Sequence, residues 1–177
     1  MIDRIRLACR FFTATALLAS FAAAAQDHQA ASWATHELDF QYMGFTSRYS
    51  CSGLQGTVKQ ILLQLGAKEE PGMVRFGACS GSGDRPGRIA GVHIKVATLQ
   101  LDTGATSPVD AVWKTVTIGG RDLDADCELI EQAGKEILPL FATRNVQPLN
   151  VSCFPNQPTT VPARLTLEVL VPAATAK

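Results

Sequence analysis

The residues of this chain best suited to chemistry are its five cysteines and three histidines. Cysteine can serve as a disulfide partner, a metal ligand or a reactive thiol, and the redox state of the compartment favours one role over the others. The chain contains no Cys-x-x-Cys sequence, so thiol–disulfide catalysis has no recognisable motif. The role of the cysteines therefore depends first on whether the protein is exported.

Residues 1–25 have the pattern of a secretory signal peptide. Three arginines lie in MIDRIRLACR, and the apolar run FFTATALLASFAAAA that follows ends in small residues, as a cleavage site requires. A membrane span needs about 20 apolar residues, so this run is short for an anchor. We expect cleavage after Ala25, a periplasmic or secreted protein, and no membrane span after signal cleavage.

Export places the remaining cysteines in an oxidising compartment, where an even number predicts disulfides. Cys9 leaves with the signal, so Cys51, Cys79, Cys127 and Cys153 remain, with three pairings open to them. A helix starting at Cys51 would rise about 22 Å, and a strand ending at Cys79 would return about 23 Å. A helix starting at Cys127 and a strand ending at Cys153 would bring the later two cysteines together in a similar way. The predicted disulfides are therefore Cys51–Cys79 and Cys127–Cys153.

Two stretches of the chain resemble each other, namely CSGLQGTVKQILLQLG from Cys51 and CELIEQAGKEILPLFA from Cys127. Both begin with Cys, carry Leu or Ile at the fourth place and Lys at the ninth, and then continue with Ile-Leu. Apolar periodicity is common among helices, so chance similarity is the alternative. The shared cysteine, lysine and following strand cysteine favour an internal repeat.

The residues around each helix predict strands, so each copy is a strand–helix–strand–strand unit. Leu38, Phe40 and Tyr42 alternate with polar residues, which is the spacing of a half-buried strand. Ser50 and Asp126 directly precede the two helices, where their side chains can cap a free amide. The predicted segments are a signal peptide (1–25), a flexible lead-in (26–35), a first unit (36–101), a linker (102–110) and a second unit (111–173).

One unit alone would leave a helix or a sheet face uncovered, so we expect residues 26–177 to form one compact domain. The predicted fold class is α+β: a tandem duplication of a β-α-β-β unit, mainly antiparallel sheet with two helices packed on it, and two intra-repeat disulfides. Pro139 would cost about 3 kcal/mol inside the second helix. That helix is therefore expected to end or kink near Glu136.

The other polar motifs are weak. His36 with Glu37 and Asp39 is a fragment of a metal site, but a metal needs several converging ligands. The segment DLDADCE, with Asp122 and Asp124, resembles a calcium loop but lacks its turn glycine and its late glutamate. The chain contains neither a phosphate-binding Gly-Lys-Ser/Thr ending nor a Gly-x-Ser-x-Gly elbow. We therefore predict no metal and no cofactor.

The charge of the chain argues against nucleic acid as a partner. Removing the signal takes three of 16 basic residues and one of 16 acidic residues, which leaves a net charge of −2. Nucleic-acid binding would need a clustered positive face. The predicted partner is an unknown protein or small ligand in the cell envelope.

The segments RYSCSGL, DCELIEQ and ATRNV resemble those of a group of small exported proteobacterial proteins that have no assigned activity. This resemblance implies a periplasmic or secreted α+β domain with paired cysteines. It implies no catalytic residues.

We expect a ligand to bind in the groove between the two units, because pockets favour interfaces between substructures. Arg48, Arg144 and His93 are the candidate ligand-binding residues. The main hypothesis is a non-catalytic binding or assembly module of the cell envelope. The alternatives are a small exported enzyme, such as a hydrolase using His36, His93, Asp39 and Arg144, or an inhibitor presenting its loops to a foreign enzyme.

Overall fold

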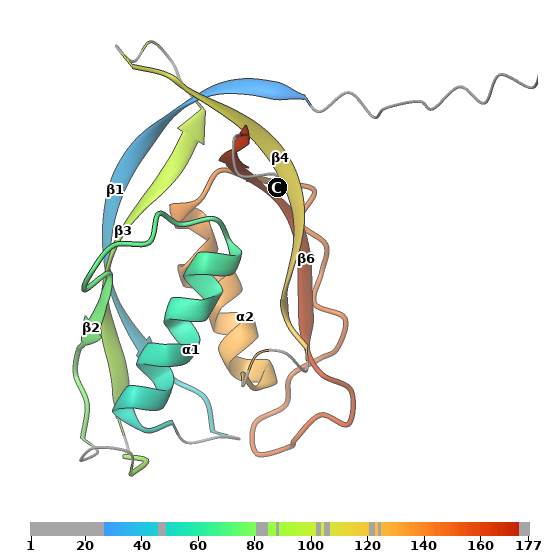
Figure 1. Cartoon of the computed structure of the whole chain (residues 1–177). Coiled ribbons are helices and arrows are strands. Elements are labelled where there is room, and N and C mark those ends of the chain that lie inside the picture. The colour runs from blue at the N-terminus through green and yellow to red at the C-terminus, as the bar shows by residue number, and fades with distance from the viewer. Residues whose placement is uncertain are drawn as a thin grey trace, which may run out of the picture.

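The computed structural model describes residues 27–45, 49–80, 85–87, 89–101, 104, 107–120, 123 and 125–173. The expected signal peptide, Arg48, Asp122 and Asp124 lie outside the described residues. Figure 1 shows a curved sheet whose concave side holds the helices. None of the described helices is long and apolar enough to cross a membrane.

Nine elements follow one another among the described residues. They are β1 (His28–Tyr42), α1 (Cys51–Gln64), β2 (Val74–Phe76), β3 (Ala90–Leu101), β4 (Val109–Gly119), α2 (Cys127–Glu136), the 3₁₀ helix η1 (Leu138–Leu140), β5 (Thr143–Arg144) and β6 (Arg164–Pro172). We call β1 to β3 with α1 the first half, and β4 to β6 with α2 and η1 the second half. The fold class is α+β, as the sequence predicted.

The six strands that the structure describes form one antiparallel sheet in the order β2-β3-β1-β4-β6-β5. In each half the first strand pairs with the third, and the third pairs with the second. Among the described strands, β1 and β4 are the pair that joins the halves within the sheet, over four residue pairs from His28↔Val112 to Ala31↔Val109. From this junction the two parts of the sheet diverge, and both helices lie between them (Figure 1).

The first strand is longer than the sequence indicated. The lead-in was expected to run to residue 35, but β1 already begins at His28. Its first part contains three alanines, which have low strand propensity, so no local pattern marks it. Pairing with β4 and with the end of β3 orders this segment, and that contact depends on the tertiary fold.

The helices begin where the sequence predicted. Ser50 caps α1 by accepting a hydrogen bond from the Gly53 amide (3.0 Å), and Asp126 caps α2 by accepting from the Leu129 amide (2.7 Å). The regular part of α2 ends at Glu136, and the chain continues as η1. Pro139 lies within that short helix, which confirms the expected end of α2.

The two predicted disulfides are confirmed. Cys51 bonds to Cys79, with their Cα atoms 6.0 Å apart, and Cys127 bonds to Cys153, with their Cα atoms 5.5 Å apart. Each bond ties the first residue of a helix to a later segment of the same half. No disulfide crosses from one half to the other among the described residues.

The main core fills the space between the diverging parts of the sheet. Both helices bury their apolar faces there, against inward residues of β1, β3 and β6. Its largest fully buried side chains are Phe40, Leu54, Ile61, Leu62, Leu65, Ile94, Ile118, Leu129, Ile130, Ile137 and Leu167. A smaller apolar cluster of Ala31, Leu99, Ala111 and Leu170 covers the opposite face of the sheet at the junction. Burial on both faces therefore stabilises the short β1–β4 ladder.

A polar contact holds the halves together at the other end of β1. The Tyr42 hydroxyl donates to the Asp126 carboxylate (2.6 Å), and the Tyr49 hydroxyl accepts from the Asp126 backbone amide (2.9 Å). The two rings meet edge to face with centroids 5.0 Å apart. Burial, together with the hydrogen bond to Asp126, raises the pKa of Tyr42 well above its ordinary value. The first half is thus linked to the start of α2.

Candidate functional site

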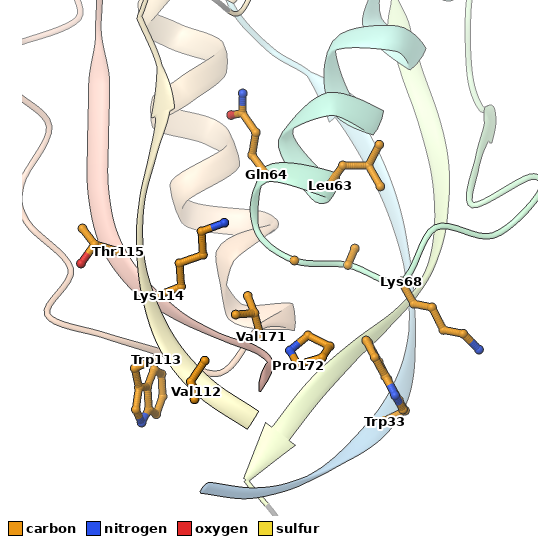
Figure 2. A pocket seen from close by; sticks show the side chains of 12 residues that line it. Trp33, Leu63, Gln64, Lys68, Val112, Trp113, Lys114, Thr115, Val171 and Pro172 are labelled. Atoms are coloured by element: carbon orange, nitrogen blue, oxygen red, sulfur yellow. The ribbon is translucent and has the colours of Figure 1, made fainter. Parts of the chain in front are cut away.

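A cavity of about 720 Å³ lies between the halves, where the sequence led us to expect a groove. We call it the junction cavity. The first half contributes Trp33, Leu63, Gln64, Gly66, Ala67 and Lys68, and the second half contributes Val112, Trp113, Lys114, Thr115, Val171 and Pro172. Its walls are thus the end of α1 on one side and β4 with the end of β6 on the other (Figure 2).

The way α1 ends sets the width of this cavity. Gly66 has a φ of +83°, and its amide bonds back to the Leu63 carbonyl (3.0 Å). A Cβ at this position would lie 2.7 Å from Cγ1 of Val171 on β6. Glycine therefore provides both the left-handed backbone and the close approach of α1 to β6. The chain then turns toward β3, where the Lys68 amide bonds to the Ala97 carbonyl (3.0 Å).

Lys114 is the cation that faces the junction cavity. Its side chain extends from β4 toward the last turn of α1, and Gln64 lies across the same space (Figure 2). Within the described part of the chain, no ion pair or hydrogen bond involves the Lys114 ammonium. Lys68 differs, because it points away from the cavity and pairs with Glu70 (3.0 Å). The site therefore presents one positive charge among apolar walls.

Sequence reasoning missed Lys114, although a signal for it exists. Along β4, Val112, Val116 and Ile118 occupy alternate positions that face the helices, and Lys114 stands in the same row. Lys114 itself is exposed, so its ammonium stays hydrated at the edge of the cavity, and it is the charged member of an otherwise apolar row. A charged residue in this apolar row was the sequence signal that could have pointed to Lys114.

Both tryptophans of the chain line the junction cavity. Trp33 and Trp113 lie at its lower rim in Figure 2, with their rings directed away from Lys114. The Arg144 guanidinium lies 4.5 Å from the centre of the Trp113 ring. A ligand that binds at this rim should therefore change the fluorescence of Trp33 and Trp113.

Arg144, a predicted ligand-binding residue, is held on the surface by partners within the protein. Its guanidinium pairs with Glu168 and lies 3.5 Å from the Asp27 carboxylate. The Arg144 hydrogen bond, followed by one from Asn145, lowers the pKa of Glu168. Arg144 is not among the residues that line the junction cavity.

His93, the other predicted residue within the described part of the chain, lies outside the cavity. Its Nδ1 is 2.8 Å from Oδ1 of Asp39, its partner in the β1–β3 ladder. A second pair, Lys95 with Glu37 (2.7 Å), lies beside it in the same ladder and lowers the pKa of Glu37. His93 therefore belongs to a solvent-facing row of charged pairs on the convex side of the sheet.

The residues of the enzyme hypothesis do not gather at one place, and of the four only Asp39 and His93 are in hydrogen-bond contact. Asp39 and His93 share one face of the sheet, whereas His36 lies on the opposite face, since successive strand residues alternate. Arg144 belongs to the second half. Among the described residues, no group of three or more His, Cys, Asp or Glu side chains is placed to hold a metal ion.

A second cavity of about 410 Å³ lies within the second half, between α2 and residues 146–149. Its lining is mostly apolar, with Ile130, Leu138 and Leu165 among its walls. Glu131, the one charged residue of this lining in the described part of the chain, pairs with Lys135 at 2.7 Å. Of the two, only the junction cavity combines apolar walls with a charge that lacks a partner in the described part of the chain.

Comparisons with protein-family models, with curated proteins and with solved structures return no match. The functional conclusion therefore follows from the geometry of the site.

Proposed function

We propose that this protein is a non-catalytic binding module of the cell envelope, periplasmic or secreted, which holds a small ligand in the junction cavity. The observation that carries this proposal is the Lys114 ammonium, directed into an apolar-walled cavity without an anionic partner in the described chain. A site with one fixed charge and apolar walls can orient a ligand.

Two features support export. Disulfides form and persist in oxidising compartments, and each half carries one. Residues 1–25 have the composition of a signal peptide. Export also fits a binding module that meets its ligand outside the cytoplasm.

We further propose that the two halves arose by tandem duplication. The order of the elements, the strand pairing and the position of the disulfide agree between them. Joining two such units creates the junction cavity, because its walls come from both. Duplication thus gives a physical origin to a site that a single unit lacks.

The proposal is tested by filling the junction cavity. Leu63→Trp replaces a leucine of the cavity wall with the bulkier indole side chain of tryptophan. Gln60→Trp introduces the same side chain on the exposed side of α1 and serves as the matched control. Wild type and both variants are exported, purified and compared by native mass spectrometry, with circular dichroism to verify folding. We expect a small molecule bound to the wild type and to Gln60→Trp, and lost from Leu63→Trp.

Two results would contradict the proposal. One is a bound molecule that Leu63→Trp retains in full. The other is the absence of any bound molecule in the wild type, both as purified and after incubation with an envelope extract.

A further inference from the structure

Given the proposed binding function, we infer that the ligand is a small amphiphile with a single anionic head and an apolar body. The head pairs with the Lys114 ammonium, and the body lies against the apolar walls of the junction cavity. Carboxylate is the simplest head of this kind.

The charge of the head follows from Lys114. Its ammonium extends from β4 into the space before α1, and the described chain supplies it with no carboxylate. Opposite charges attract more strongly near a protein surface than in bulk water, because the effective dielectric constant is lower there. A cationic ligand would meet repulsion at the same point. The site therefore selects an anion.

The number of charges follows from the other lining residues. Among the described residues of the lining, Lys68 is the only further cation, and its side chain points away and pairs with Glu70 (3.0 Å). Arg144 is engaged by Glu168 and Asp27 and lies outside the lining. A ligand with several negative charges would leave most of them without a partner. One negative charge matches the site.

The apolar body of the ligand is inferred from the apolar residues that line the junction cavity. Leu63 comes from α1, Val112 from β4, and Val171 and Pro172 from the end of β6. Small-molecule sites usually measure about 300–1,000 Å³ and are mainly apolar with a few placed polar groups. The volume of about 720 Å³ lies within that range. Gln64, across from Lys114, provides an amide that can donate to the same head.

The probe for this inference is dodecanoate, used below its micelle concentration and at neutral pH. Dodecanol has the same chain without charge, and dodecyltrimethylammonium has the same chain with the opposite charge. Binding is followed by calorimetry and by the fluorescence of Trp33 and Trp113 at the rim. We expect saturable binding of dodecanoate, weaker binding of dodecanol and still weaker binding of the cation.

Two lysine variants locate the head group. Lys114→Gln should weaken dodecanoate binding on the order of tenfold or more, since a charge-assisted contact is lost, and should leave dodecanol binding unchanged. Lys59→Gln removes a charge of α1 that pairs with Glu69 (2.8 Å) outside the lining, and should change the dissociation constant for dodecanoate by less than about twofold. Thermal unfolding of both variants verifies that they are folded.

Several results would overturn the inference. They are no binding of dodecanoate to the wild type, equal binding by wild type and Lys114→Gln, or a preference for the cation. Sedimentation with phosphatidylglycerol vesicles separates a free amphiphile from a membrane surface, and binding to vesicles alone would also count against it. If Leu63→Trp still abolishes binding of a purified ligand of another class, the proposed function stands and only the ligand class is wrong.

Discussion

Replacing Tyr42 with Phe is expected to weaken the contact between the halves at the end away from the β1–β4 junction. The change keeps the buried ring and its edge-to-face contact with Tyr49, and removes only the hydroxyl group. That hydroxyl donates to the Asp126 carboxylate at 2.6 Å. The substitution therefore removes the hydrogen bond to Asp126, together with the longer contact of the same hydroxyl to the Glu128 carboxylate (3.4 Å), between the first half and the start of α2.

The expected loss follows from the charge of the acceptor. A hydrogen bond to a charged group contributes about 1.5–3 kcal/mol to the free energy of unfolding. Asp126 keeps its capping bond from the Leu129 amide (2.7 Å) in the variant, so its carboxylate is not left unpaired. We therefore expect Tyr42→Phe to cost about 1.5–2 kcal/mol at pH 7, at the lower end of that range.

The same contact predicts a dependence on alkaline pH. Burial and the Asp126 carboxylate raise the pKa of Tyr42 above the ordinary 10.0, so the folded state holds the phenol proton longer than the unfolded chain. Stability from this group is then complete below about pH 10 and falls above it, by about 1.4 kcal/mol per pH unit. Because Phe does not ionise, the advantage of the wild type should shrink by about 1.4 kcal/mol between pH 9 and pH 11.

Urea unfolding followed by circular dichroism at pH 7, 9 and 11 measures these differences. The comparison requires that the free energy of unfolding depend equally steeply on urea concentration in each protein. Tyr49→Phe is the control for the alkaline effect, since it retains Tyr42 and its bond to Asp126. A cost below about 0.5 kcal/mol at pH 7 would refute the assigned hydrogen bond. A difference between wild type and Tyr42→Phe that stays constant from pH 9 to pH 11 would refute the pKa argument.

Two further predictions concern the covalent and backbone constraints. Replacing both Cys127 and Cys153 with Ala should lower the free energy of unfolding by about 3.5 kcal/mol, because the loop-entropy treatment gives this value for a separation of 26 residues. A midpoint of urea unfolding that stays at the wild-type value would contradict this prediction. Gly66→Ala should cost about 1–2 kcal/mol for the left-handed backbone alone, and more through the contact with Val171, as measured by thermal unfolding. Gly56→Ala, which meets no atom within 4 Å on the exposed side of α1, should instead stabilise by about 0.5–1 kcal/mol; equal effects at the two glycines would contradict this reasoning.

Local patterns predicted the parts of the fold that local chemistry determines. The caps Ser50 and Asp126, the end of α2 before Pro139 and the two disulfides all depend on residues close together in sequence or on chain reach. The early start of β1 depends on its pairing with β4, a contact between distant segments that its alanine-rich sequence does not announce.

The sequence indicated where a cavity would lie, but not which residues would line it. The groove between the units was expected, and the junction cavity lies there. Arg144 and His93 were chosen for their charge, but both are paired with acidic side chains outside the cavity. Which charges are neutralised within the protein depends on cross-strand register, and register is set by the assembled sheet. Lys114 breaks the apolar alternation of β4, but its place at the cavity became evident only once β4 had been placed with that face toward the helices.

The junction cavity depends on a difference between the two halves rather than on their likeness. When the two similar stretches are aligned, Leu63 corresponds to Pro139 and Gly66 corresponds to Ala142. In the first half, the glycine ends α1 and turns the chain toward β3, which leaves space in front of Lys114.

At the corresponding end of α2, the chain continues through Pro139 into η1. The Leu140 carbonyl there accepts hydrogen bonds from the Thr98 hydroxyl (2.7 Å) and the Gln100 amide (3.1 Å), so protein atoms occupy the corresponding position against β3. If the halves descend from one unit, their sequences have diverged at the ends of the two helices. The space at the end of α2 is filled by protein atoms, whereas the space at the end of α1 stays open as the junction cavity. A chain built in this way holds one ligand at the junction rather than two, so calorimetry with dodecanoate should give a stoichiometry of about one per chain.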